Sequence, residues 1–270
     1  MAAPGVHPRK YRGYIFDLDG TIYLGSELLP GAADLIAGLR RRGARVLFVT
    51  NNPTRNQQMY ADKLTALGVP TRPEEVVNTI VTMTTWLAAQ PCGTGVFVIG
   101  EEPLREAIKG AGVRLTERAE EVDVVVASYD RTFDYGKLQT AFDALTRPSP
   151  ARLVTTNPDV YCPFPGGRGE PDAGAIVAAI EACTKVMCSV NTGKPDRIML
   201  ETAMWILGLD VRDCIMVGDR LSTDIAMALS AGMDSALVLT GETTAKMAEE
   251  IPPELRPTHI LPDVSSLLPS

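Results

Sequence analysis

The sequence predicts an α/β protein with a doubly wound parallel sheet, and three observations support this prediction. Short apolar runs typical of buried strands alternate with segments of helical periodicity along most of the chain. Helical segments end at glycines, as Gly43 and Gly68 do after residues 30–42 and 57–67. The polar motifs follow the apolar runs directly, where an open parallel sheet binds its ligands.

The elements follow one another in a regular order. Strands are expected at 14–16, 45–49, 95–99, 122–127, 152–155, 214–217 and 235–239, with a short one near Ile260. Helices are expected at 30–42, 57–67, 102–109, 135–145, 173–183, 195–207 and 222–230. The stretch 157–171 is rich in proline and glycine, and we expect a long loop there.

Composition limits the classes of partner. The chain has 270 residues, of which 45% are hydrophobic and 22% charged, which is ordinary for a soluble globular protein. Its net charge of −7 argues against a broad basic surface for nucleic acid or an anionic membrane. No apolar window reaches the length of about 18 residues that spans a membrane. We therefore expect no nucleic-acid partner and no membrane partner.

Cysteine and histidine usage narrows the chemistry further. The five cysteines are scattered without a C-x-x-C pair, which predicts reduced thiols. The only histidines, His7 and His259, lie near the two ends, so a histidine zinc site and a Ser-His-Asp triad are excluded. Residues 1–13 lack the apolar segment of a signal peptide, and the cytoplasm is the expected location.

Acidic residues after the strands suggest a metal-assisted reaction. Asp17, Asp19 and Asp219 are hard oxygen donors of the kind that Mg²⁺ prefers. One carboxylate can attack phosphorus, as in aspartyl-phosphate enzymes. A second carboxylate two residues along a strand points to the same face, where it can protonate a leaving alcohol and later deprotonate water. Such acid–base catalysis contributes about 10²–10⁴ in rate.

Four further residues suit a phosphoryl group. Lys194 is a point charge that can neutralise a phosphate dianion, and Thr50 and Asn51 offer hydrogen-bond donors. Gly20 lets the backbone N–H groups after Asp19 approach an anion. Each motif alone has an ordinary explanation as a turn, a helix cap or an exposed side chain. If the strands that carry them are neighbours, these residues and the aspartates meet in one crevice.

The motifs resemble those of the haloacid dehalogenase superfamily of phosphotransferases, and the resemblance spans nearly the whole chain. The matching segments are YIFDLDGT at 14–21, FVTNN at 48–52, GKP at 193–195 and VGDRLSTDI at 217–225. The resemblance implies that Asp17 is the nucleophile that forms a phospho-aspartate. It implies that Asp19 is the general acid and base, with its backbone carbonyl on Mg²⁺. Asp219 would be a direct Mg²⁺ ligand and Asp224 a supporting carboxylate, while Thr50, Asn51 and Lys194 would bind the phosphoryl group.

Spacing points to a subgroup of this superfamily. The segment between Asp19 and the helix near Pro30 is too short for a cap domain, whereas the segment between Thr50 and Lys194 is long enough. With Tyr23 and Gly25 after the first motif, the chain resembles the NagD/p-nitrophenylphosphatase-like subfamily, whose smaller α/β cap is of the C2 type. We expect a catalytic core at 1–84 and 184–270 and a cap for substrate specificity at 85–183.

Three cap residues are candidates for substrate contact. Asn157 and Asp159 belong to a TNPD segment that matches the subfamily, and Asp172 stands where its members usually carry a Pro-Gly-x-Gly type sequence. Glu170 and Asp172 would add negative charge near the mouth and disfavour very anionic substrates such as nucleotides with several phosphates. The expected substrate is a small phosphorylated metabolite: a sugar phosphate, a nucleoside monophosphate or p-nitrophenyl phosphate. The resemblance also suggests a homodimer.

Other functions use similar residues. Phosphoryl transfer to a second sugar, as in a mutase, is the nearest alternative, although such relatives usually carry a cap after the first motif. Halide displacement needs no Mg²⁺ and leaves Asp19 and Asp219 without a purpose. A signalling module that accepts phosphate on an aspartate, or a binding protein without turnover, belongs to another class. A dinucleotide-binding dehydrogenase is disfavoured because no G-x-G-x-x-G follows the first strand.

Overall fold

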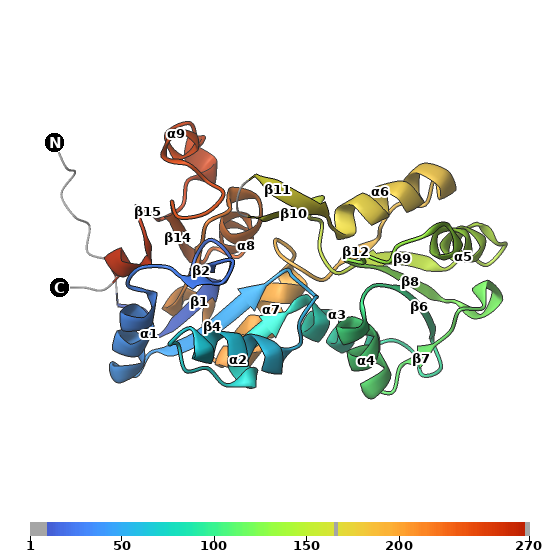
Figure 1. The fold of residues 1–270 in the computed structure, drawn as a ribbon, viewed down its shortest axis with the longest axis horizontal. Coiled ribbons are helices and arrows are strands. Elements are labelled where there is room, and N and C mark those ends of the chain that lie inside the picture. Colours follow the sequence, from blue (N-terminus) through green and yellow to red (C-terminus); the bar gives the residue numbers. More distant parts are fainter. Residues whose placement is uncertain (1–9, 165–166, 268–270) are drawn as a thin grey trace. The chain divides into compact units, whose positions relative to one another are not determined.

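The computed structural model describes residues 10–164 and 167–267, and the chain forms two compact units (Figure 1). The first unit takes in the chain up to Thr50, residues 60–76 and the chain from Leu200 onward. The second takes in residues 51–59 and 77–199. The second unit contains all of the predicted cap, 85–183, and extends beyond it at both ends. The exact boundaries of a functional cap remain a prediction. Most of the segment 1–13, for which no signal peptide was expected, lies outside the described residues, as does His7.

The first unit is built on a sheet in the order β15-β14-β13-β1-β4-β5, whose last strand, β5, begins in the first unit with Val76 and continues into the second. Its strands are β1 (Gly13–Asp17), β4 (Arg45–Thr50), β5 (Val76–Asn78), β13 (Cys214–Gly218), β14 (Asp234–Val238) and β15 (His259–Leu261). Strand β1 pairs in parallel with both β4 and β13, and the pairs β13–β14 and β14–β15 are parallel as well. The chain therefore runs outward from β1 in both directions, which confirms the predicted doubly wound sheet.

Helices flank this sheet, and a small hairpin follows β1. The helical segments are α1 (Ala32–Arg41), α2 (Gln57–Ala66), α7 (Arg197–Leu207), a π-helical turn (Leu221–Ile225), α8 (Ala226–Ser230) and α9 (Ala245–Glu249). The hairpin consists of β2 (Tyr23–Leu24) and β3 (Glu27–Leu28). The predicted helix over 222–230 is thus a π-turn that continues into a short α-helix. This wider turn falls on the segment that carries Asp224.

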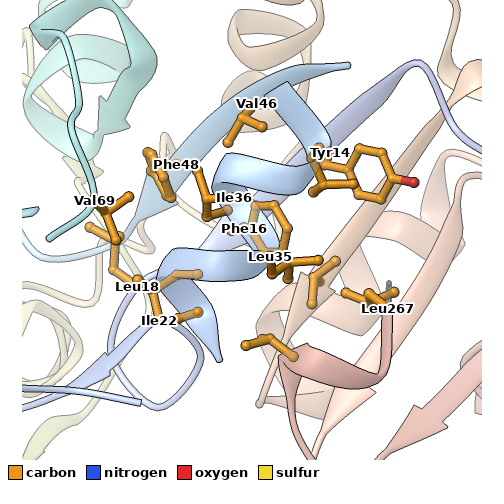
Figure 2. Packing of buried hydrophobic residues seen from close by; sticks show 14 of the residues in the cluster. Tyr14, Phe16, Leu18, Ile22, Leu35, Ile36, Val46, Phe48, Val69 and Leu267 are labelled. Carbon is orange, nitrogen blue, oxygen red and sulfur yellow. The ribbon is translucent and has the colours of Figure 1, made fainter. Parts of the chain in front are cut away.

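The core of the first unit explains why β1 holds its position. All five residues of β1 are buried, which is typical of a strand covered on both faces. Figure 2 shows Phe16 of β1 and Phe48 of β4 gathered with Leu35 and Ile36 of α1, and all four side chains are at most 1% exposed. Burial of a large apolar side chain contributes about 1.5–3 kcal/mol, so the strand that ends at Asp17 is firmly held.

The second unit has a five-stranded sheet in the order β12-β9-β8-β6-β7. Its strands are β6 (Gly95–Ile99), β7 (Arg114–Leu115), β8 (Val124–Ala127), β9 (Arg152–Thr155) and β12 (Val190–Asn191), all paired in parallel. Its helices are α3 (Thr79–Ala88), α4 (Glu102–Gly110), α5 (Tyr135–Thr146) and α6 (Ala173–Thr184). The sequence prediction missed α3, which is rich in threonine and is capped by the side chain of Asn78.

The prediction of a long loop over 157–171 is wrong. Residues Tyr161–Phe164 (β10) and Arg168–Pro171 (β11) pair as an antiparallel hairpin, while 165–166 lie outside the described residues. Proline disfavours central strands because it lacks an N–H, but in a two-stranded ribbon each strand has an edge where Pro163 is tolerated. The proline and glycine content therefore concealed a hairpin.

Two smaller expectations concern cysteines and membranes. None of the five cysteines forms a disulfide in this structure, and their reduced state in the cell stays a prediction. Over residues 10–164 and 167–267, no helix combines the length and the apolar character needed to cross a membrane.

Candidate active site

The carboxyl ends of three neighbouring strands carry predicted site residues of the first unit. Asp17 is the last residue of β1 and pairs with Val49, so Thr50 lies one residue further along β4. On the other side Phe16 pairs with Val217, and Asp219 comes just after the end of β13. Parallel strands end at the same edge of the sheet. The pairing of β1 with β4 and β13 is therefore what places these three motifs side by side.

Three aspartates form a buried cluster at this edge. Asp17, Asp219 and Asp224 each place one carboxylate oxygen within 4.8 Å of the others, and their exposed fractions are 8%, 2% and 0%. Like charges this close repel one another, and a cation that lies among them relieves the repulsion. A set of hard oxygen donors fits Mg²⁺ or Ca²⁺ and does not fit a metal that prefers thiolate or imidazole. The residues present therefore suit a divalent oxygen-loving cation.

Asp19 differs from these three because its side chain is exposed and lies outside the cluster. It forms an isolated bridge with Tyr23, and the N–H of Gly20 donates to the Tyr23 carbonyl at 2.8 Å. Burial, followed by the charge of Asp19, raises the pKa of Tyr23 well above its usual range. The Nζ of Lys63 lies 3.3 Å from the centroid of the Tyr23 ring, so the ammonium group makes a cation–π contact with that ring. Tyr23 and Lys63 were not among the predicted site residues.

Gly20 is required by both conformation and space. Its φ is +84°, and a Cβ there would lie 2.6 Å from Oδ2 of Asp219. Gly218 is required by space, because a Cβ there would lie 2.2 Å from the Asp224 carboxyl carbon. Asp224 also accepts a hydrogen bond from the N–H of Arg220 at 3.2 Å. Glycines thus let the first and fourth motifs approach the aspartates closely.

One loop of the first unit was missed by the sequence reasoning. Residues 240–243 follow β14, and the N–H of Glu242 donates to Oδ2 of Asp219 at 2.6 Å. Thr240 donates its hydroxyl to the Gly20 carbonyl at 2.6 Å. The available signal was a glycine, Gly241, placed just after a predicted strand, in the same position as the other motifs.

In the second unit Asn51 and Lys194 are joined by two hydrogen bonds. The N–H of Lys194 donates to Oδ1 of Asn51 at 2.7 Å, and Nδ2 of Asn51 donates to the Lys194 carbonyl at 3.0 Å. The same Nδ2 donates to Oδ2 of Asp159 at 2.9 Å, so both amide hydrogens of Asn51 have acceptors. A phosphate contact by the Asn51 side chain would require breaking one of these bonds. The Lys194 side chain is 2% exposed.

The three predicted cap residues belong to the same network. Asn157 donates to the Asn51 carbonyl at 3.2 Å and to Asp172 at 3.3 Å, and its Oδ1 accepts from the N–H of Asp159 at 2.9 Å. Asp172 is 5% exposed and caps α6 by accepting from the N–H of Ala173 at 2.6 Å. The structure therefore gives Asp172 a helix-capping position, and its effect on anionic substrates remains a prediction.

The predicted residues thus fall into two groups. The first unit brings Asp17, Gly20, Asp219 and Asp224 together with Asp19 and Thr50 at the same edge. The second unit joins Asn51, Lys194, Asn157, Asp159 and Asp172 by hydrogen bonds. The peptide bond between Thr50 and Asn51 connects the two groups through the chain.

Comparison with known proteins agrees with this architecture. A model of the haloacid dehalogenase-like hydrolase family matches residues 14–114, and a second model of HAD-like hydrolases matches residues 191–267. The 5'-nucleotidase YutF of Bacillus subtilis is 37% identical over 97% of this chain and 99% of its own length. The crystal structure of 4-nitrophenylphosphatase from Thermotoga maritima superimposes with a TM-score of 0.88 at 32% identity, covering 96% of each chain. NagD from Escherichia coli gives 0.84 at 26% identity, covering 95% of this chain and 98% of its own.

The chain belongs to the haloacid dehalogenase-like hydrolase family. Its structural neighbours include NagD and p-nitrophenylphosphatases, which confirms the family resemblance found in the sequence. Within this family the chain is an enzyme of the phosphoric monoester hydrolase class.

Proposed function

We propose that the chain is a Mg²⁺-dependent phosphatase that hydrolyses small phosphomonoesters through a phospho-aspartate on Asp17. The observation that carries the proposal is the buried cluster of Asp17, Asp219 and Asp224, next to the exposed Asp19. A buried carboxylate at the end of a rigid central strand is well placed to attack, because its direction is set by the sheet.

The aspartates have two proposed roles, which are cation binding and proton transfer. Asp17, Asp219 and the backbone carbonyl of Asp19 would hold Mg²⁺, and Asp224 would support them. When bound, Mg²⁺ lowers the repulsion between the attacking carboxylate and the phosphoryl oxygens. A carboxylate oxygen of Asp17 attacks phosphorus, and the bond between phosphorus and the leaving oxygen breaks. The carboxyl group of Asp19 donates a proton to that leaving oxygen. Asp19 then takes a proton from water, which attacks phosphorus and releases phosphate from Asp17.

Other residues would bind the transferring group and the substrate. Thr50, the backbone around Gly20, the backbone of Asn51 and the side chain of Lys194 would contact the phosphoryl oxygens, since donors and a cation stabilise the charge that accumulates there. Asn157, Asp159 and Asp172 would shape the substrate site within the cap.

The substrate range follows from what the relatives are named for. Nucleoside monophosphates and p-nitrophenyl phosphate are the substrates suggested by the 5'-nucleotidase and the 4-nitrophenylphosphatase. Sugar phosphates are suggested by an acid sugar phosphatase of Staphylococcus haemolyticus that is 34% identical to this chain. The phosphatase relatives favour hydrolysis over transfer to a second sugar. Cytoplasmic location and a homodimer remain predictions, and light scattering on the purified chain would test the latter.

The test is phosphate release from these three substrate classes, with and without Mg²⁺. We expect many phosphates per chain, dependence on Mg²⁺, and a loss of at least about 10³-fold in Asp17→Asn, which keeps the shape and removes the nucleophile. Asp143→Asn, on the exposed face of α5, is the matched control and should keep full activity. A single phosphate retained per chain would indicate a signalling module. No release from any substrate would refute the phosphatase.

A further inference from the structure

We propose that residues 240–243 form a positioning element for the metal site, and we call Thr240, Gly241, Glu242 and Thr243 the Asp219 clamp. The inference rests on the proposed function, since it concerns the cation of that reaction. It assigns a role to a loop that the catalytic motifs do not include. All of its contacts lie within the first unit.

The clamp holds Asp219 at two points. The N–H of Glu242 donates to the carboxylate Oδ2 at 2.6 Å, and the N–H of Thr243 donates to the Asp219 backbone carbonyl at 3.2 Å. The first bond joins a charged acceptor to a backbone donor, and bonds of that kind are shorter and stronger than neutral ones. Because the side chain and the backbone are both held, the direction of the Asp219 carboxylate depends on where residues 242 and 243 lie.

Gly241 makes this approach possible. A Cβ at position 241 would lie 2.0 Å from Oδ2 of Asp219 and 2.9 Å from its Cβ, both far inside contact distance. The φ of Gly241 lies outside the left-handed region, so the requirement for glycine is one of space. Any larger residue here must push the loop or Asp219 away.

Thr240 connects the clamp to the first motif. Its hydroxyl donates to the Gly20 carbonyl at 2.6 Å, and the Cα of Gly241 would be 3.0 Å from a Cβ at Gly20. The same loop therefore holds Asp219 and the turn that follows Asp19. An ion pair of 3.0 Å between Arg220 and Glu242 closes the loop on the outside, where such a pair contributes little.

Groups that orient metal ligands affect metal affinity by about 10–100-fold when removed. We therefore expect Gly241→Ala and Thr240→Val to raise the Mg²⁺ concentration needed for half-maximal effect by about tenfold or more. Valine keeps the shape of threonine and removes only the hydroxyl bond, and Thr240→Ser should restore the affinity. Gly110→Ala is the matched control, because nothing lies within 4 Å of a Cβ there.

The measurement is the rise in Tm of each full-length variant as Mg²⁺ alone is added, since a bound ion stabilises the folded state. Phosphate release should recover in the clamp variants at saturating Mg²⁺, which a general loss of structure would not allow. If Gly241→Ala does not fold, the Thr240→Val and Thr240→Ser pair decides the question. A half-maximal Mg²⁺ concentration in Thr240→Val equal to that of the unmodified chain would overturn the inference. If the unmodified chain itself neither responds to Mg²⁺ nor releases phosphate, the proposed function fails instead.

Discussion

The two units present parallel sheets whose carboxyl edges differ in chemistry. In the first unit, Asp17, Asp219 and Asp224 each have a carboxylate oxygen that lies within 4.8 Å of those of the other two. In the second unit, the residues that directly follow β8 and β9 are the uncharged Ser128 and Thr156, and the hydroxyl of Thr156 donates to Ser128 at 2.9 Å. Asn157, which follows Thr156, uses both its donors and its acceptor within the unit.

This difference shows how one architecture serves two purposes. A hydrogen-bonded edge is stable by itself when each buried donor finds an acceptor. At an edge of crowded carboxylates the like charges repel one another, and a bound cation relieves that repulsion. Both sheets place residues at the carboxyl ends of their strands. The side chains at those positions determine whether the edge can bind a cation or only stabilises the unit.

The largest effect should come from removing one charge of the first edge. Asp219→Asn should lower phosphate release at least about 100-fold, equal to about 2.7 kcal/mol, because a cation ligand is lost. Its Tm without Mg²⁺ should not fall, since the change relieves repulsion and the amide oxygen can still accept from Glu242. Calorimetry and a phosphate assay on the same sample check both, with Asp143→Asn as control. A marked fall in the metal-free Tm would contradict the expected repulsion among these carboxylates.

The opposite pattern is expected in the second unit. Asn157→Ala should lower the free energy of unfolding by about 1–3 kcal/mol, because the buried groups that it bonds lose their partner. Denaturant unfolding measures this cost, and Gln139→Ala on the exposed face of α5 should change it little. The comparison fails if Asn157→Ala proves no less stable than that control.

Added Mg²⁺ should affect variants of the two edges differently. At ten times its dissociation constant, Mg²⁺ should stabilise the chain by about 1.4 kcal/mol. The rise in Tm should vanish in Asp219→Asn and persist in Asn157→Ala, because only the first edge holds the ion. A rise retained in Asp219→Asn would place the ion elsewhere.

The smallest effect concerns one hydroxyl. Thr156→Val should cost about 1 kcal/mol, since it removes the bond to Ser128 in a buried position. Thr156→Ser keeps the hydroxyl and serves as its control. Equal stability of the valine and serine variants would show that this bond adds nothing to the second edge.

Much of the fold could be predicted from the sequence because the main strands and helices carry a strong apolar pattern. The strands that became β1, β4 and β6 lie within a residue or two of their predicted positions, since each is a continuous apolar run. Several elements were missed, among them α9, α3 and the hairpin β10–β11. The hairpin β10–β11 has no alternating apolar pattern, and α3 carries β-branched residues that weaken a helical signal.

The site divides in the same way. Asp17, Asp19, Thr50, Lys194 and Asp219 were recognisable because each follows a strand or opens a helix in a known order. The second hydrogen-bond network was recognised only in part. Its residues were named, but nothing in the sequence indicated that the Asn51 amide is fully used within the chain.

The sequence by itself determined the fold class, the family and the residues of the candidate site, because these depend on local patterns and on order along the chain. Only the tertiary structure decided which groups share an edge and which are already bonded. Gly241 meets Asp219 because β13 and β14 are neighbours. Such neighbours are set by strand pairing between distant segments, and no local window of sequence contains that information.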